Sequence, residues 1–581
     1  MISSKIQPKL RFAVMCNGMI LRKFQVEALR HLLGIPEAEL VLLIVDGRET
    51  EPLNFASKLK AISRIKNTFW PIFTRLIRLE KGSPLELECA PAELAAVPKI
   101  RCKTFRKGKY SDYFEEADLE AIRAYKLDFI VKFAFGILRG GILQAARYGV
   151  WSYHHDDPDR YRGVPPAFWE VYFRDPVSGA ILQRLTEKLD GGIILRKCAV
   201  KTIFHSYKQN LSNVLSASVV MPAQVVQDLL VGQADYVDGP PSTTTAPIFR
   251  LPTNLQVLVF IYTCVSAFLK RQIKGLLRVD SWNVGVVNSP IHRFTDPVFV
   301  PDVKWLPYRQ AKRFIADPFA IAPGELLAEE FDYDLNRGYL VRLRQVGERL
   351  EVEKVLDDGR HLSYPYLLKV DGAVYMIPES AASREVALYR MDTDGSFTKV
   401  CTLLSNLAAL DASVIRYEGR WWMFTTDADG PKDANLHIFY ADELTGSWMA
   451  HPLNPVKMDV CSSRPAGTPF IHNGQLFRPA QNCSVTYGGA MALNRVEILT
   501  PTQFKEVTIR ELRHEGQSRY RIGFHTLAAG DGITVVDGRC DETNLELVMR
   551  NMTHKLKRLL KLPIYSASRV SGYAGTATPE R

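Results

Sequence analysis

The sequence predicts an α/β domain with a doubly wound parallel sheet, followed by an all-β domain of repeated units. Three observations predict this arrangement. Strand-like and helix-like segments alternate over the first part of the 581-residue chain. A stretch rich in proline, glycine and hydroxyl residues interrupts the alternation at 238–247. Beyond it, a strand–turn–strand unit recurs about every 50 residues.

The first predicted domain covers residues 1–235. Residues 12–16 form a short apolar run that ends at a turn, and helical apolar spacing follows over 19–33. The run 40–45 is continuously apolar, and the run 127–138 is apolar except at isolated polar positions. Both patterns are typical of strands buried on both faces of a parallel sheet. We therefore expect ligands in the crevice at the carboxyl ends of these strands.

Residues 236–285 are expected to hold a linker and an amphipathic helix. The stretch from Leu251 to Leu269 has no charged residue and approaches transmembrane length. It contains proline, threonine, asparagine, glutamine and serine, which makes it too polar to predict a membrane span. We expect the helix to continue to Leu277 and to pack between the two domains. Peripheral contact with a membrane surface is the alternative.

Residues 286–550 are predicted to form a five-bladed β-propeller, and 551–581 a basic C-terminal tail. Each repeated unit has an apolar strand, a hairpin turn with glycine and a second strand, which is typical of a propeller blade. The units begin near residues 315, 363, 410, 467 and 525. Five blades are therefore expected.

The net charge of +11 is modest for this length and lacks long blocks of Lys or Arg. Basic patches at 270–274 and 556–562 suit an anionic sugar nucleotide, a polysaccharide or an acidic membrane surface. Nine cysteines without C-x-x-C pairs argue against a disulfide framework or a zinc site, so we expect no metal and a reducing cytoplasmic location. The N-terminus has no apolar core of signal-peptide type. The oligomeric state is not predicted.

The candidate active site lies in the stretch YGVWSYHHDDPDRYRG at 148–163, followed about thirty residues later by LDGG at 189–192. Aligned on its Tyr-Arg-Gly, this pair of segments resembles the active-site signature of the folate-dependent formyltransferases. The family His then falls on His154 and the family Asp on Asp190, while Ser152 stands where the family has Asn.

The resemblance implies a formyltransferase-like α/β domain and roles for these three residues. An amine that attacks the formyl carbon of formyltetrahydrofolate produces a tetrahedral oxyanion, and His154 is expected to donate a hydrogen bond to it. Asp190 is expected to raise the pKa of His154 and to take up the proton that the amine sheds. Ser152 can donate too, but it is shorter than Asn, and loss of one such donor typically costs about a hundredfold to a thousandfold in rate. Two interpretations stay open: a slower or re-engineered transferase, and a fold kept for binding.

The cofactor implied by the resemblance is formyltetrahydrofolate. Phe135-Gly136-Ile137 resembles the family turn that contacts the folate pterin through backbone groups. The aromatic helix at 167–172 is interpreted as core packing first. A structural interpretation of the motif also exists, in which His155, Asp156, Asp157 and Asp159 form a solvated polar loop.

The second half carries a different resemblance. The segments Ala-Asp-Pro-Phe at 316–319, Tyr-Pro-Tyr-Leu at 364–367 and Pro-Glu-Ser at 378–380 resemble the five-bladed propellers of furanosidase-like glycoside hydrolases. They resemble more closely the propeller at the start of glucosamine inositolphosphorylceramide transferases. Glycoside hydrolysis needs two carboxyl groups that flank a sugar.

The glycoside hydrolase resemblance is partial. Asp317 matches the first-blade carboxylate, whereas Tyr364 stands where Asp is usual and Asp411 where Glu is usual. We expect Asp317 and Asp411 to face each other, unpaired, across a central cavity. The residues expected to line that sugar-binding cavity are Asp317, Tyr364, Glu379, Asp411, Arg464 and His525. The alternative is that the two aspartates cap strands and bind no sugar.

Together these features predict an N-formyltransferase that moves a formyl group from formyltetrahydrofolate to an amino-sugar nucleotide or glycan-linked amine, with the propeller as a carbohydrate-binding module. A nucleic-acid substrate is not expected, because the propeller replaces the small C-terminal barrel of the family members that act on transfer RNA. The alternative is a protein of glycan or glycolipid metabolism whose active unit is the propeller and whose formyltransferase domain is degenerate.

Overall fold

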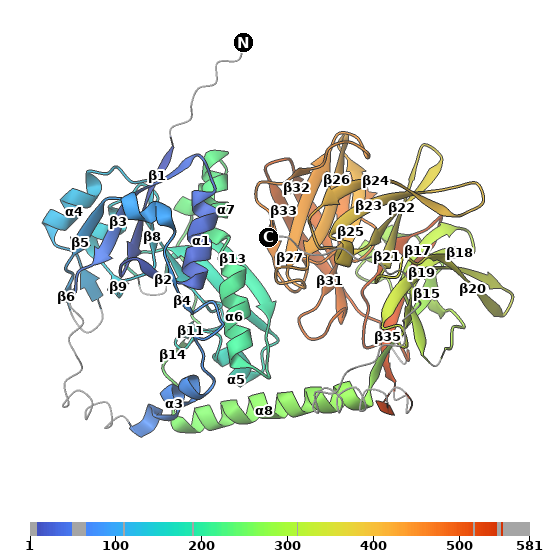
Figure 1. Ribbon diagram of the computed structural model, residues 1–581, viewed down its shortest axis with the longest axis horizontal. Coiled ribbons are helices and arrows are strands. Elements are labelled where there is room, and N and C mark those ends of the chain that lie inside the picture. The colour runs from blue at the N-terminus through green and yellow to red at the C-terminus, as the bar shows by residue number, and fades with distance from the viewer. Residues whose placement is uncertain are drawn as a thin grey trace, which may run out of the picture.

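The computed structural model describes residues 9–48, 65–107, 111–188, 191–310, 312–514, 518–542, 546 and 548–549. Asp190 and the basic tail at 551–581 lie outside the described residues. Figure 1 shows an α/β half and a strand-rich half side by side, with the long helix α8 (Asn254–Leu277) running beneath both.

A seven-stranded sheet forms the centre of the first half, in the order β13-β12-β10-β8-β1-β3-β5. Its strands β1, β3, β5, β8 and β10 are parallel, and β12 and β13 add an antiparallel edge. The strands are β1 (Leu10–Cys16), β3 (Ala38–Asp46), β5 (Lys99–Cys102), β8 (Phe129–Lys132), β10 (Val150–His154), β12 (Val177–Arg184) and β13 (Ile193–Lys201). The predicted doubly wound sheet is confirmed, and its strand order reverses between β8 and β1.

The two faces of this sheet are covered by different helices. Alternate residues of β1 point to opposite faces, so Phe12 and Val14 belong to one apolar core and Ala13 and Met15 to another. The first core includes residues of α1 (Lys23–Leu33), α6 (Tyr207–Ser218) and α7 (Met221–Leu230). The second includes residues of α4 (Glu116–Arg123) and the 3-10 helix η3 (Gly140–Gln144).

Smaller elements complete this half. They are β2 (Ile20–Arg22), η1 (Ile65–Asn67), α3 (Phe69–Leu76), β4 (Leu87–Cys89), η2 (Ala92–Ala96), β6 (Phe105–Lys107), β7 (Ser111–Tyr113), β9 (Ile137–Leu138), β11 (Arg162–Gly163), α5 (Trp169–Phe173), η4 (Asp235–Asp238) and β14 (Ile248–Phe249). The apolar run at 127–138 is not one strand as expected. Phe135, with φ of 67°, turns the chain between β8 and β9.

Helix α8 confirms the predicted helix, and its first turns belong to the core of the first half. Thr253 caps the helix in a capping box with Gln256. Phe260 is fully buried and stacks on Phe168, with ring centroids 4.2 Å apart. None of the helices in the described residues is both long enough and apolar enough to cross a membrane.

The segment 238–247 is not a free linker. The Thr244 hydroxyl donates to the Pro158 carbonyl at 2.7 Å, and β14 pairs with β11 immediately afterwards. Part of the range 236–285 therefore packs on the first half, because Val237, Val257 and Phe260 belong to its core.

The described part of the second half contains five antiparallel sheets, equal in number to the predicted units. Their strands are β16-β15-β35-β34 (Val303–Trp305, Val279–Val287, Thr534–Glu542, Leu527–Ala529); β17 to β20 (Arg313–Ala322, Glu325–Asp332, Arg337–Val346, Arg349–Leu356); β21 to β24 (Ser363–Val370, Ala373–Glu379, Glu385–Met391, Phe397–Ser405); β25 to β29 (Ala409–Tyr417, Arg420–Asp427, Asn435–Ala441, Met449–Ala450, Lys457–Met458); and β30 to β33 (Phe470–His472, Gln475–Asn482, Ala490–Leu499, Phe504–Leu512). The 3-10 helices η5 (Ile291–Thr295) and η6 (Ala381–Ser383) lie between strands.

One sheet differs from the expected repeat. Its strand β35 pairs along its whole length with β15, which precedes all the other strands of this half. Because β15 begins at Val279, it starts within the range expected to hold the linker and helix. The earliest and latest strands of the half are thus held in one sheet.

The two halves meet through backbone and side-chain contacts. The Val460 amide donates to the Ala199 carbonyl of β13 at 2.9 Å. The Gln224 side chain of α7 donates to the Leu453 and Pro455 carbonyls at 3.3 and 2.6 Å. The carboxyl end of α8 also reaches the second half, where Lys274 pairs with Asp541 at 3.1 Å.

Candidate functional site

The candidate transferase site lies at the carboxyl end of β10. Ser152 and His154 are two residues apart on this strand and therefore share one face of the sheet. Ser152 is the register partner of Lys132 on β8, so a lysine lies beside it at the same edge. Burial lowers the pKa of Lys132. This edge is next to the reversal of strand order, where open α/β sheets bind ligands.

A buried carboxyl group accompanies His154. The Asp156 Oδ2 atom lies 4.0 Å from His154 Nε2, and Asp156 is 2% exposed. Its other oxygen accepts a hydrogen bond from the Ala167 amide at 2.9 Å. Burial, followed by the neighbouring charge of Glu170, raises the pKa of Asp156. Asp156 is therefore buried beside His154 and is not solvated.

Glu170 lies behind Asp156 and is fully buried on α5. Burial raises the pKa of Glu170 to about 8. Two carboxyl groups in one apolar surrounding cannot both ionise easily, so the Asp156–Glu170 pair retains a proton near neutral pH.

His155 has a different environment from His154. Its ring stacks on Tyr153 at 5.5 Å and meets the edge of Phe24 at 5.4 Å. Burial lowers the pKa of His155 to about 3, so its imidazole stays neutral. His155 also lines a pocket of about 730 Å³ together with Trp70, Pro166 and other residues.

The expected folate-contacting turn is engaged within the protein. The Gly136 amide donates to Asp112 Oδ2 at 2.9 Å, and the same carboxyl oxygen pairs with Arg48 at 2.8 Å. A Cβ atom on Gly136 would lie 2.6 Å from Asp112 Oδ2, so glycine is required here. Phe135 packs on Phe114, and Ile137 begins β9. Of the three backbone groups expected to face a pterin, the Gly136 amide is thus already bonded.

Asp190, the expected partner of His154, lies outside the described residues. The role that the motif implies for it stays a prediction. Among the described residues, Asp156 places a carboxyl oxygen 4.0 Å from His154 Nε2.

A second cluster includes one residue from the first strand of each of three sheets in the second half. Asp317, Tyr364 and Asp411 have φ of 51°, 45° and 52°, which is the left-handed region. Each lies at a register shift between the first two strands of its sheet. The three positions are thus structurally equivalent, and non-glycine residues keep such a conformation mainly at functional or tightly packed positions.

Asp317 faces a buried histidine. His525 Nδ1 lies 3.4 Å from Asp317 Oδ1 and 2.5 Å from Asp537 Oδ2. Burial alone would lower the pKa of His525, but Asp537 and Asp317 outweigh it and raise that pKa. Burial raises the pKa of Asp317 to about 6. The imidazole also stacks on Trp282 with centroids 3.8 Å apart.

The same three residues form a set of metal-ligand type. One ligand atom from each of Asp317, His525 and Asp537 lies within 4.8 Å of the others. We expected no metal, and the His525–Asp537 ion pair already satisfies these atoms with a proton. The cluster fits either a cation or a buried charge network.

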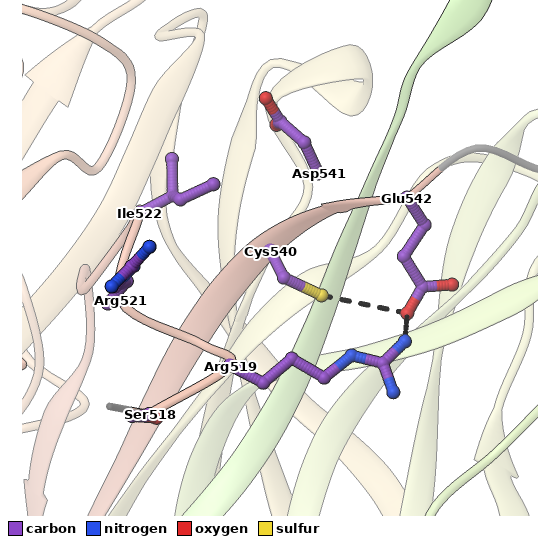
Figure 2. A pocket seen from close by; sticks show the side chains of 7 residues that line it. All are labelled: Ser518, Arg519, Arg521, Ile522, Cys540, Asp541 and Glu542. Atoms are coloured by element: carbon purple, nitrogen blue, oxygen red, sulfur yellow. Dashed lines mark hydrogen bonds and ion pairs between the residues drawn. The ribbon is translucent and has the colours of Figure 1, made fainter.

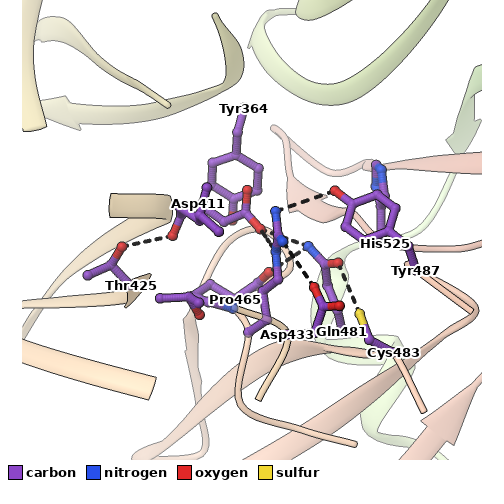
Figure 3. A network of polar contacts seen from close by, with 12 residues as sticks. Tyr364, Asp411, Thr425, Asp433, Pro465, Gln481, Cys483, Tyr487 and His525 are labelled. Carbon is purple, nitrogen blue, oxygen red and sulfur yellow. Dashed lines mark hydrogen bonds and ion pairs between the residues drawn. The ribbon is translucent and has the colours of Figure 1, made fainter. Parts of the chain in front are cut away.

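Asp411 is held by a buried arginine. Figure 3 shows Asp411 in a polar network with Gln481 nearby. Arg464 Nε donates to Asp411 Oδ2 at 2.6 Å, and the Gln481 amide donates to the same oxygen at 2.8 Å. Asp411 and Arg464 are 3% and 5% exposed. Asp317 and Asp411 were expected to be unpaired. That expectation is wrong, because Asp411 pairs with Arg464 and Asp317 lies 3.4 Å from His525, which it shares with Asp537.

Tyr364 and Glu379 also lie inside this network. The Tyr364 hydroxyl accepts from the Gly467 amide at 2.6 Å and lies 2.7 Å from the Ser413 hydroxyl, and the side chain is fully buried. Tyr364 therefore joins neighbouring sheets instead of lining an open cavity. Burial and then Asp411 raise the pKa of Glu379.

Tyr487 covers the network from the outer side. It is 38% exposed, its ring lies 5.0 Å from the Arg464 guanidinium, and it meets the edge of His525 at 5.4 Å.

A separate hollow of about 530 Å³ lies near the carboxyl end of the second half (Figure 2). Arg519 and Glu542 pair with each other across it, and the Cys540 thiol lies 3.6 Å from the same carboxylate. Both of its acids are already paired, Glu542 with Arg519 and Asp541 with Lys274 and Arg278, so we assign no chemistry to it.

Sequence reasoning missed three acids. Glu170 lies in an aromatic helix that we interpreted as core packing, and Asp156 in a loop that we allowed to be solvated. Asp537 lies in the otherwise apolar start of β35. A single acid in an apolar run is the signal that could have identified Glu170 and Asp537.

Comparison with known proteins separates the chain into two resemblances. Residues 344–539 match the family model described as "Glucosamine inositolphosphorylceramide transferase 1, N-terminal". The protein of that name from Oryza sativa subsp. japonica is 31% identical over 245 residues, which is 39% of this chain and 33% of the rice protein. This chain thus spans about a third of the length of that relative.

Other relatives are formyltransferases. Methionyl-tRNA formyltransferase from Agathobacter rectalis is 32% identical over 170 residues, covering 28% of this chain and 52% of that protein. Among solved structures, a sugar 3N-formyl transferase shares 10% identity over 45% of this chain and 81% of its own, with a TM-score of 0.27. An exo-beta-1,3-galactanase from Clostridium thermocellum shares 12% over 35% and 53%, with a TM-score of 0.28. The chain joins a part similar to formyltransferases to a part similar to the glucosamine inositolphosphorylceramide transferase N-terminal region.

Proposed function

We propose that the first half transfers a formyl group from formyltetrahydrofolate to the amine of an amino sugar, held as a nucleotide or in a glycan. The observation that carries the proposal is the His154–Asp156 pair at the carboxyl end of β10. This position lies at the ligand-binding edge of a doubly wound sheet. The similarity to formyltransferases supports the same chemistry.

The reaction follows from these groups. The amine attacks the formyl carbon, and His154 donates a hydrogen bond to the oxyanion that forms. The bond from the formyl carbon to the folate nitrogen then breaks, and that nitrogen takes up the proton that the amine loses. Because Asp156 and Glu170 have raised pKa values, they can hold a proton near the imidazole near neutral pH.

All nine cysteines are free, which fits the reducing cytoplasm that we propose.

We also propose that the five sheets are the blades of a closed propeller that binds the carbohydrate. Supporting contacts join the first strands of some sheets to one another or to the segment before β30: the Tyr364 hydroxyl of β21 lies 2.7 Å from the Ser413 hydroxyl of β25, Asp411 of β25 binds Arg464, and Gly467 bridges to Leu527 of β34. The buried network at these contacts suits specific binding better than hydrolysis, because its carboxyl groups are already paired.

The test is formyl transfer by the full chain, measured as tetrahydrofolate release with a panel of amino-sugar nucleotides. His154→Ala should abolish transfer, whereas His31→Ala, an exposed histidine on α1, should leave it unchanged. Wild-type rates in the His154→Ala protein would refute the site. Isothermal titration with a folate analogue provides a second readout, and no binding to the wild-type chain would refute the cofactor.

A second candidate function is favoured by the buried network itself. If the second half is the active unit in glycan or glycolipid processing, the first half is a scaffold. Binding of glycans without any binding of a folate analogue would favour this candidate.

A further inference from the structure

The underside of the molecule carries a large exposed apolar surface on α3 and α8, which we call the α3–α8 face. Figure 1 shows both helices along one side of the molecule. The exposed apolar side chains are Phe69, Ile72 and Leu76 on α3 and Leu255, Leu258, Val259, Tyr262, Val265, Phe268, Leu269, Ile273 and Leu277 on α8. Surfaces of this kind on soluble domains usually mark an interaction site.

The exposed residues of α8 form one continuous stripe. Leu255, Leu258, Tyr262, Val265 and Leu269 follow one another at intervals of three and four residues, which places them on one side of the helix. The opposite side, with Val257 and Phe260, is fully buried against the first half. The helix is therefore apolar on two sides, and packing within the chain uses only one of them.

The charges on the two helices have a single sign. Neither α3 nor α8 contains Asp or Glu, whereas Arg75, Lys270, Arg271 and Lys274 lie on them. Lys274 pairs with Asp541 and Arg271 contacts His205. Arg75 and Lys270 form no ion pair within the described residues. Cations beside exposed apolar side chains are typical of helices that lie on anionic membranes.

Two hollows open beside α3. One of about 260 Å³ lies between α3, α6 and α8 and is lined by Phe73, Ile77, Val265 and Phe268 among others. The pocket of about 730 Å³, lined by Trp70 and Leu215, has three cations, Arg75, Arg78 and Lys81, in its wall, and its one acid, Glu80, is paired with Arg22. Apolar hollows edged by cations match acyl chains that end in phosphate headgroups.

We propose that the α3–α8 face binds the surface of a bilayer that contains anionic phospholipid, with α8 lying along the interface. A second copy of the chain fits less well, because it would bring a face without acids against another such face. A span is not involved, since no described helix meets the requirements for crossing. The inference is independent of formyl transfer.

The test is co-sedimentation of the full chain with vesicles of phosphatidylcholine alone and of phosphatidylcholine mixed with phosphatidylserine. We expect binding to the mixed vesicles that weakens as salt is raised, and little binding to the neutral ones. The double variant Tyr262→Glu with Leu269→Glu should bind the mixed vesicles about tenfold more weakly or worse. Both side chains are more than half exposed, so the fold should persist, as circular dichroism would show.

A matched control changes exposed apolar residues elsewhere. Val352→Glu with Val400→Glu, both on strands of the second half, should bind vesicles as the wild type does. Equal binding by the Tyr262/Leu269 variant and the wild type would overturn the proposal, as would failure of the wild type to bind mixed vesicles. A dimer that the Tyr262/Leu269 variant dissociates, without vesicle binding by the wild type, would assign the face to a second copy instead.

Discussion

A substitution at Arg464 should test most directly whether the buried charge network stabilises the second half. Arg464→Met keeps much of the side-chain length and removes the cation that binds Asp411 at 2.6 Å. Asp411 would then be left 3% exposed beside Glu379, without its positive partner. Removal of one member of a buried ion pair typically costs about 3–5 kcal/mol. For a domain of this size we expect the Tm of the second half to fall by about 6–10 °C.

The loss of stability in Arg464→Met should also depend on pH. Loss of the guanidinium removes a charge that lowers the pKa of Glu379, so burial and Asp411 raise that pKa further above its value in the unfolded chain. A group with a raised folded pKa binds more protons when folded, so its contribution to stability is lost as pH rises. The deficit of Arg464→Met relative to the wild type should therefore be greatest above about pH 7 and shrink toward about pH 5.

Differential scanning calorimetry across this pH range is the assay. Arg384→Met is the control, because Arg384 is half exposed and its partner Asp429 is more exposed still. Its Tm should stay close to that of the wild type. An unchanged Tm in Arg464→Met, or a deficit that grows as pH falls, would refute the network as described.

Three further predictions concern other parts of the molecule. Gly136→Ala should destabilise the first half by about 1–3 kcal/mol, because its Cβ would lie 2.6 Å from Asp112 Oδ2. Gly275→Ala in α8, where a Cβ would meet no atom within 4 Å, should stabilise the protein by up to about 1 kcal/mol. Denaturant unfolding measures both changes in stability, and equal effects would contradict the packing around Gly136. Burial raises the pKa of Asp317 to about 6, so the stability that this group contributes is lost as pH rises from about 4 to about 6. Asp317→Asn should flatten the fall in Tm over that range, and an identical profile would count against it. A fragment that ends near Arg278 should unfold at higher temperature than one that ends near Gln233, because only the longer one keeps Phe260 in the core; equal Tm values would show that α8 adds nothing.

The local pattern of the chain predicted much of the fold but not its long-range pairings. The strand over β1 and the helix α8 follow from apolar spacing alone. Spacing did not show that Phe135 turns the chain, because an apolar residue with positive φ leaves the pattern unchanged. Nor did the spacing predict that β15 pairs with β35, because that pairing depends on contacts between opposite ends of the second half.

The candidate site was predictable to a similar extent. The motif identified His154 directly. It did not identify Glu170, because burial beside Asp156 depends on how α5 packs against the sheet and not on neighbouring residues in the sequence. Likewise, the charge state of Asp317 depends on His525 and Asp537, which reach it from the far end of the chain.

The sheet that contains β15 and β35 can be completed only at the end of synthesis of the second half. Val279 leaves the ribosome long before Glu542, its partner in the finished sheet. While the intervening strands are synthesised, the edge of β15 that will pair with β35 stays unpaired beside the completed first half. A chain stopped before Thr534 would keep the other four sheets' strands but have no partner for that edge of β15. Arrested or truncated products of this protein should therefore be the ones that chaperones and proteases recognise first.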